Sequence, residues 1–172
     1  MATTSILRLR PVPLTRGLFT PFGDVIESEG NPHYTINDGY AERYSDLTAV
    51  DVGEQDGQIR VNIFHALPRT LPLPIRMVEC HPLSSQAFVA MSGRPFLVVV
   101  AAPGKAPPPQ DLHAFVTNGR QGVNYARGTW HHPLIAFEAP GEFLVIDRGG
   151  PGENNDEVFF GEGEIVLEAP TV

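Results

Sequence analysis

Cysteine, basic charge and long apolar runs are all scarce in this chain of 172 residues. Because Cys80 is the one cysteine, an intrachain disulfide is excluded, and apolar neighbours such as Val78 indicate a buried, unreactive thiol. Only 12 basic residues stand against 20 acidic ones, so neither nucleic acid nor an anionic membrane is an expected partner. No run approaches the ~20 apolar residues that span a bilayer. The composition predicts a soluble, cytoplasmic protein.

Long helices are also excluded, because 17 glycines and 17 prolines are spread evenly along the chain. We expect short helices only near Thr15–Phe19, where Thr15 can cap, and around Ala41–Leu47. The segment Pro103–Asp111 is predicted to be a surface loop. The length fits one domain covering residues 1–172, with a substantial core.

What is abundant is the pattern of short β-strands. Gly57–His65 alternates, with Ile59, Val61 and Ile63 on one face, and Phe96–Ala102 is a continuous apolar run typical of a strand buried on both sides. The other expected strands are Asp24–Glu27, Tyr34–Ile36, Ala87–Met91, Leu112–Thr117, Leu134–Glu138, Glu142–Asp147, Val158–Phe160 and Ile165–Leu167. Such spacing predicts an all-β sandwich or barrel.

Residues able to carry chemistry gather in two clusters on either side of the central apolar run. In the first, Glu79 and His81 are two apart, so a strand would point both side chains to one face, and Gln86 follows. The second is the pair His131-His132, which stands before a proline at a strand entrance. Imidazole, carboxylate and amide groups together suit a metal site for Mn, Fe, Ni or Zn, or acid–base chemistry near neutral pH.

The spacing of these clusters resembles the two motifs of the cupin superfamily, which are small β-barrels or jelly rolls with a metal site in the mouth. Glu79, His81, Gln86 and Gly93 occupy the positions of the first motif, and the second is matched by Gly122, Gly128 and His131. The resemblance implies an all-β, cupin-like barrel and a candidate metal site of Glu79, His81, Gln86 and His131. Since this set has fewer imidazoles than the usual one, both a divalent metal (Ni, Mn or Zn) and a metal-free site remain open.

Longer strings make the resemblance more specific, and they resemble the ureidoglycolate lyase family in the family's order. They are Phe22–Glu27, Asn37–Gly39, Glu42–Tyr44, His81–Phe88, Phe115–Tyr125, Trp130–Leu134 and Phe143–Gly150. The resemblance implies a homodimeric carbon–nitrogen lyase of the amidine-lyase type. Such an enzyme cleaves (S)-ureidoglycolate to glyoxylate and urea in the allantoin branch of purine breakdown.

Ureidoglycolate is a carbinolamine, so its cleavage needs one general base for the hydroxyl proton and one general acid for the leaving nitrogen. With this substrate, His131 or His132 is the expected base or metal ligand, and Glu79 and His81 are the expected acids or ligands. The substrate carboxylate favours an arginine.

Substrate contacts are expected from further polar residues. Arg148 is the first choice for the carboxylate and Arg43 the second, although a structural ion pair explains Arg148 equally well. Gln86 and Asn124 offer donors and acceptors to the urea amides, and Tyr125 is expected at the pocket wall. Asn118 is also a candidate, but Asn118-Gly119 is a stronger signal for a turn.

Two alternatives to the lyase remain open. A hydrolase acting on the same compound would release ammonia and carbon dioxide, and it would need an activated water at the ureido carbonyl. A binding module that senses a small acid would need a cation and donors but no acid–base pair. The density of titratable groups in the two clusters favours catalysis.

Overall fold

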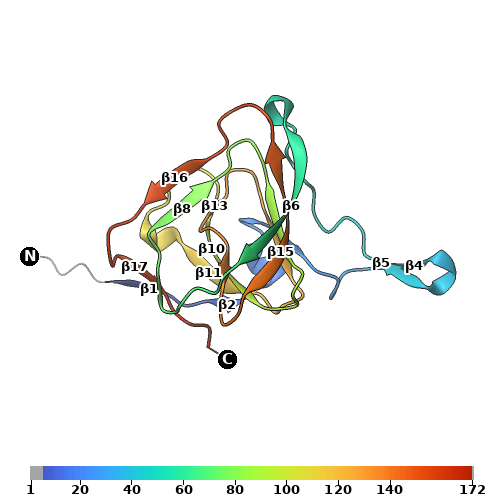
Figure 1. Ribbon diagram of the computed structural model, residues 1–172, viewed down its shortest axis with the longest axis horizontal. Helices are drawn as coiled ribbons and strands as arrows, with labels where there is room; N and C mark the ends of the chain where they lie inside the picture. Colours follow the sequence, from blue (N-terminus) through green and yellow to red (C-terminus); the bar gives the residue numbers. More distant parts are fainter. Residues whose placement is uncertain (1–5, 172) are drawn as a thin grey trace, which may run out of the picture.

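The computed structural model describes residues 6–171, and it confirms an all-β architecture with a central sheet between two others (Figure 1). The central seven-stranded sheet is β16 (Asp156–Phe159), β8 (Met77–Cys80), β13 (Trp130–His131), β10 (Phe96–Ala101), β11 (His113–Val116) and β2 (Val12–Pro13), with β14 (Ile135–Ala136) also paired to β10. The five-stranded sheet is β3 (Gly23–Ile26), β12 (Gly122–Tyr125), β9 (Gln86–Ala90), β15 (Gly141–Gly149) and β6 (Gln58–Ala66). The three-stranded sheet is β1 (Leu7–Leu9), β17 (Ile165–Leu167) and β7 (Leu73–Pro74).

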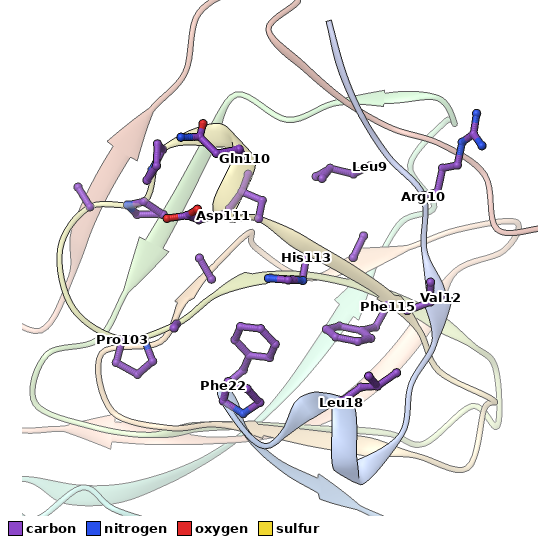
Figure 2. A pocket seen from close by; sticks show the side chains of 18 of the residues that line it. Leu9, Arg10, Val12, Leu18, Phe22, Pro103, Gln110, Asp111, His113 and Phe115 are labelled. Atoms are coloured by element: carbon purple, nitrogen blue, oxygen red, sulfur yellow. The ribbon is translucent and has the colours of Figure 1, made fainter.

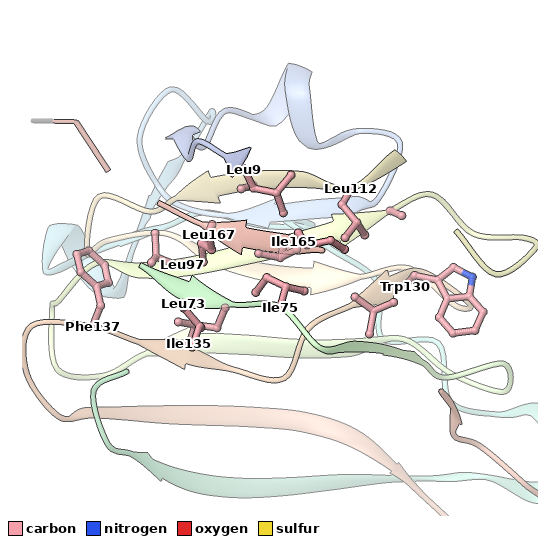
Figure 3. Packing of buried hydrophobic residues seen from close by; sticks show 14 of the residues in the cluster. Leu9, Leu73, Ile75, Leu97, Leu112, Trp130, Ile135, Phe137, Ile165 and Leu167 are labelled. Atoms are coloured by element: carbon pink, nitrogen blue, oxygen red, sulfur yellow. The ribbon is translucent and has the colours of Figure 1, made fainter. Parts of the chain in front are cut away.

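Strand β10 holds the layers together because its side chains alternate between two apolar cores. Phe96, Val98 and Val100 pack with residues of the five-stranded sheet such as Phe143. Leu97 and Val99 belong to the other core, which includes Leu9, Leu73 and Ile165 of the three-stranded sheet (Figure 3). The continuous apolar run predicted to be buried on both sides is therefore confirmed.

A small two-stranded hairpin, β4 (Tyr34–Ile36) and β5 (Ala41–Arg43), extends away from the three sheets (Figure 1). The helix expected around Ala41–Leu47 is wrong, because its first residues pair with β4 as strand β5. The other expected helix is confirmed as α1 (Arg16–Phe19), whose Leu18 N–H donates to Thr15 Oγ1 over 3.3 Å. Three short 3-10 turns cover Asn37–Gly39, Glu54–Asp56 and Pro109–Asp111.

Each other strand expected from the sequence has a counterpart, but Leu134–Glu138 keeps only the two residues of β14 as strand. The strands β1, β2, β7, β8, β12 and β13 were not predicted, since each has only two to four residues and gives too short a pattern. The alternation in β6 is confirmed, but its apolar face points outward and Val61 is 64% exposed. In the described part of the chain, no helix is long and apolar enough to cross a membrane.

The core between the central and five-stranded sheets predicts a strong effect of one truncation. Phe143 is 1% exposed and meets Phe96 edge-on, with ring centroids 5.2 Å apart. Phe143→Ala should lower the free energy of unfolding by about 3–5 kcal/mol, because a buried cavity remains. Urea denaturation of the two proteins measures this loss. Phe159→Ala is the control, since Phe159 is 71% exposed and should change stability little.

Candidate functional site

Three of the predicted residues meet at one end of the space between the central and five-stranded sheets. Glu79 of β8 and His131 of β13 are direct cross-strand neighbours, and His81 follows β8. Their ligand atoms all lie within 4.8 Å of one another. His131 Nε2 is 3.7 Å from Glu79 Oε1, and the centroids of the two imidazole rings are 5.1 Å apart. The pairing of β8 with β13 therefore joins the two sequence clusters.

The orientation of His131 is set by its surroundings. Its Nδ1 donates to the backbone oxygen of Thr129 over 2.9 Å, so Nε2 carries the lone pair. The Thr129 hydroxyl donates in turn to the backbone oxygen of Phe22 over 2.8 Å. Tyr125 stacks on the imidazole, with centroids 4.3 Å apart. His131 Nε2 is buried and has no hydrogen-bond partner within residues 6–171.

Burial dominates the titration of the cluster. It lowers the pKa of His131 to about 3, helped by the nearby His81 imidazole, so His131 is neutral at pH 7. Burial also raises the pKa of Glu79, while His81 opposes that shift and Glu157 adds to it. The pKa of the Tyr125 phenol is raised by burial, which keeps it protonated. The site thus offers a neutral imidazole lone pair beside a carboxyl group with reduced acidity.

A polar wall from the five-stranded sheet faces the cluster. His81 Nδ1 donates to the backbone oxygen of Asn154 over 2.8 Å, and His81 Nε2 lies 3.2 Å from Gln86 Oε1. Asp147 of β15 accepts from Asn62 Nδ2 of β6 over 3.0 Å. Burial raises the pKa of Asp147, and His81, Asn62 and Gln86 reduce this shift. His81, Gln86 and Asp147 therefore come together on one polar wall.

A cavity of about 270 Å³ opens on this wall, and its lining includes His81, Gln86, Asp147 and Arg148. The guanidinium of Arg148 is already engaged: Nη2 donates to the backbone oxygens of Glu54 over 2.6 Å and Pro151 over 2.7 Å. Arg148 therefore fastens two loops beside the cavity as well as lining it.

Four of the candidate residues are not brought to the cluster: His132, Asn124, Arg43 and Asn118. His132 has its Nδ1 2.7 Å from the Pro133 oxygen, and burial lowers its pKa. Asn124 Nδ2 donates to Thr48 Oγ1 over 2.7 Å on the opposite face of β12. Arg43 lies on the extended hairpin, over the ring of Tyr34 at 5.7 Å (Figure 1). Asn118 accepts from the Arg120 N–H over 2.9 Å, as expected of a turn residue.

Sequence reasoning missed Asp147, Asn62 and Asn154. The signal for Asp147 was present, because alternation places it on the same face of β15 as the apolar residues Phe143 and Val145. Arg148 then belongs to the other face. Asn62 and Asn154 gave no local signal, since they come from segments far from either cluster.

The donor set fits a divalent metal. Two imidazoles and one carboxylate are the mixed nitrogen and oxygen ligands of Zn, Mn, Fe or Ni sites that keep open positions for substrate. The unpaired Nε2 of His131 is aimed at this cluster, and the bonds from Nδ1 of both imidazoles to backbone oxygens are typical of metal-ligating histidines. Glu79, His81 and His131 would hold the ion.

The sheet architecture is that of an all-β, cupin-like fold, and it carries a partly buried histidine–carboxylate cluster. Comparison with known families makes the assignment specific: residues 6–168 match the ureidoglycolate lyase family, and the chain belongs to that family.

Individual relatives agree with this assignment over most of their length. A ureidoglycolate lyase of Azotobacter vinelandii is 53% identical over 155 residues, covering 90% of this chain and 93% of the relative. One from Stutzerimonas stutzeri is 52% identical, covering 92% and 93%. One from Pseudomonas paraeruginosa is 51% identical, covering 94% and 96%.

The buried neutral imidazole predicts a specific pH dependence of stability. The pKa of His131 is about 3 in the fold and about 6.5 when unfolded, so the unfolded chain binds more protons between these values. Its contribution is therefore complete above about pH 6.5 and is lost as the pH falls toward 3. In metal-free protein, His131→Gln should make the stability curve shallower by up to about 1.4 kcal/mol per pH unit.

Urea denaturation between pH 4 and 7 measures this slope. The control is Leu67→Gln, because Leu67 is 78% exposed and neither side chain titrates in this range, so the slope should stay unchanged. An identical slope in His131→Gln and the wild-type protein would show that His131 is not held neutral by the fold.

Proposed function

We propose that this chain cleaves (S)-ureidoglycolate to glyoxylate and urea, as a step of allantoin breakdown. The observation that carries the proposal is the Glu79–His81–His131 cluster beside a cavity, in a chain about half identical to named ureidoglycolate lyases. In the reaction, the hydroxyl oxygen loses its proton and forms the carbonyl of glyoxylate. The carbon–nitrogen bond breaks, and the leaving urea nitrogen takes up a proton.

We assign the proton transfer to Asp147. A general acid–base group works best when its pKa lies near the working pH, and burial moves the pKa of Asp147 upward, in that direction. Its hydrogen bond from Asn62 fixes the carboxyl group at the cavity wall. His131 is a poor base with a pKa of about 3, so its lone pair favours the ligand alternative.

We predict that Arg148 binds the substrate carboxylate, and we add Arg60 as a second candidate. Arg60 is the cross-strand neighbour of Asp147, and its positive charge lowers the pKa of that carboxyl group. Its Nη1 makes only long contacts, of 3.3 Å to Gln58 Oε1 and 3.5 Å to the Ile59 oxygen. Gln86 lines the same cavity and offers an amide to the urea group.

We infer that the cluster holds a divalent metal, Ni, Mn or Zn, through Glu79, His81 and His131. A bound ion would supply Lewis-acid polarisation of a substrate oxygen. The neutral state of His131 favours metal binding, because only an unprotonated imidazole is a ligand.

The adjacent residues His131 and His132 allow a matched activity test, because only His131 belongs to the cluster. His131→Gln and Asp147→Asn should each lower turnover of ureidoglycolate by about 10²–10⁴-fold, the usual range for acid–base and ligand groups. His132→Gln is the matched control and should keep most activity, since His132 lies outside the cluster. Urea, glyoxylate and ammonia are measured together, with and without EDTA, and far-ultraviolet circular dichroism checks folding.

Each outcome separates the candidate functions. Equimolar urea and glyoxylate without ammonia supports the lyase, whereas ammonia and glyoxylate would assign the hydrolase. If folded, metal-supplemented protein shows no turnover, the chain is a binding module and not an enzyme for this compound. Metal analysis after dialysis tests the ion separately: one equivalent in the wild type and none in His81→Gln is expected, and equal contents would contradict the ligand set.

We also propose that the protein is a homodimer built on the outer face of the five-stranded sheet. Ile59, Val61 and Ile63 form an exposed apolar row on β6, which is the edge strand of that sheet. The β4–β5 hairpin extends from the barrel with Tyr40 93% exposed (Figure 1). An isolated hairpin and a long apolar edge are both unfavourable in water, so a second copy covering them is the simplest arrangement.

Charges placed in the apolar row test this interface. Val61→Asp combined with Ile63→Asp should convert the dimer to a monomer in size-exclusion chromatography with light scattering, because two carboxylates would be buried without partners. Phe159→Asp is the control, since Phe159 is exposed on β16. A monomeric wild type, or a double variant that stays dimeric, would refute the proposed interface.

We further infer that residues 1–172 act as one domain in the cytoplasm. The single cysteine, Cys80, is buried in the core beneath the central sheet, and burial raises its pKa to about 11. A single cysteine has no partner for an intrachain disulfide, and such cysteine usage suits a reducing compartment.

A further inference from the structure

A second and larger cavity, of about 900 Å³, lies apart from the candidate active site. It is an open cavity bordered by the N-terminal segment, α1, β11 and the loop before β11 (Figure 2). It shares no lining residue with the cavity beside Asp147. Its volume is in the range of sites for small organic ligands.

The cavity forms because β11 is only partly paired along one edge. Strand β2 pairs with Phe115 and Val116, whereas His113 and Ala114 have no partner from β2. Phe22 covers this part of the strand, with ring centroids 5.3 Å from His113 and 6.0 Å from Phe115. Phe22 and Phe115 belong to the core, and together with the exposed Leu18 of α1 they make an apolar wall (Figure 2).

Positive charge gathers at the rim of this cavity, although the protein as a whole carries a net charge of −8. Arg8, Arg10 and Lys105 line it, with Asp111 as the opposing carboxylate. Arg8 is paired with Glu168. Arg10 and Lys105 make no salt bridge with any residue from 6 to 171. Two cations without carboxylate partners thus line the cavity from different segments, Arg10 on the N-terminal segment and Lys105 on the loop before β11.

We propose that this cavity binds a small organic carboxylate with an apolar body. Arg10 would receive the carboxylate, Lys105 would add positive charge at the rim, and Leu18, Phe22 and Phe115 would contact the hydrocarbon part. A carboxylate paired with a guanidinium forms charge-assisted hydrogen bonds, and the apolar wall adds burial of hydrocarbon. Ureidoglycolate has no apolar body, so this ligand belongs to a different chemical class from the proposed substrate.

Lys105 provides a selective reporter because it is the only lysine in the chain. Reductive methylation with ¹³C-formaldehyde labels just the Lys105 amine and the α-amine and preserves the positive charge of both. Titration with octanoate should shift the Lys105 methyl resonance saturably. Acetate has the carboxylate without the hydrocarbon chain, and 1-octanol has the chain without the charge. Each should bind at least about tenfold more weakly than octanoate.

Two variants locate the site. Arg10→Ala should weaken octanoate binding about five- to tenfold, the effect of losing one charge-assisted contact, while the exposed Arg120→Ala should leave it unchanged. Leu18→Asp should abolish binding by placing a carboxylate against the ligand, and Leu18 is 56% exposed, so the fold should tolerate it.

Several results would overturn the proposal. They are an absence of saturable shift with octanoate, an equal response to acetate or 1-octanol, or unchanged octanoate affinity in Leu18→Asp. Turnover of ureidoglycolate is measured on the same variants and depends on the other cavity. If the wild-type protein does not turn over ureidoglycolate, the proposed function fails, but the octanoate result still decides this proposal.

Discussion

Burial of β10 on both faces is the constraint on which the rest of the structure depends. Phe96, Val98 and Val100 enter one core and Leu97, Val99 and Ala101 enter the other, so a single six-residue strand joins three sheets. A strand in this position tolerates no charge on either side. The polar site is consequently displaced to one end of the central sheet, where β13 pairs with β8 and also with the last residues of β10.

The same packing determines the chemistry of His131. Val100 is its cross-strand neighbour in β10, Tyr125 stacks on its ring, and the Thr129 oxygen fixes its tautomer. Burial around the ring lowers the pKa of the imidazole, although the bond to Thr129 opposes that shift, and Nε2 keeps a lone pair with no hydrogen-bond partner among residues 6–171. Thr129 is held through Phe22, so the ligand geometry rests on the aromatic core rather than on surface loops. Rigidity of this kind suits a site that must hold groups in place before substrate arrives.

Much of the fold was readable from the local patterns of apolar residues. The apolar run of β10 and the alternation of β6 both gave correct strands. The helix expected around Ala41–Leu47 failed because pairing with β4 outweighs a weak local preference. For the site, spacing brought Glu79, His81 and His131 forward, but it did not separate His131 from His132. The spacing also did not reveal Asp147. Alternation along β15 places Asp147 on the same face as Phe143 and Val145, so the sequence did indicate that it points inward.

The sequence by itself determined the family, the all-β class and three residues of the histidine–carboxylate cluster, since these depend on residue types at fixed spacings within short segments. Only the tertiary structure decided that His131 faces the cluster, that Asp147 and Asn62 complete its wall, and that Arg43 lies on a distant hairpin. These facts depend on pairing between strands far apart in the chain. Because side chains alternate along a strand, which of two neighbours enters a site is settled by the sheet that covers it.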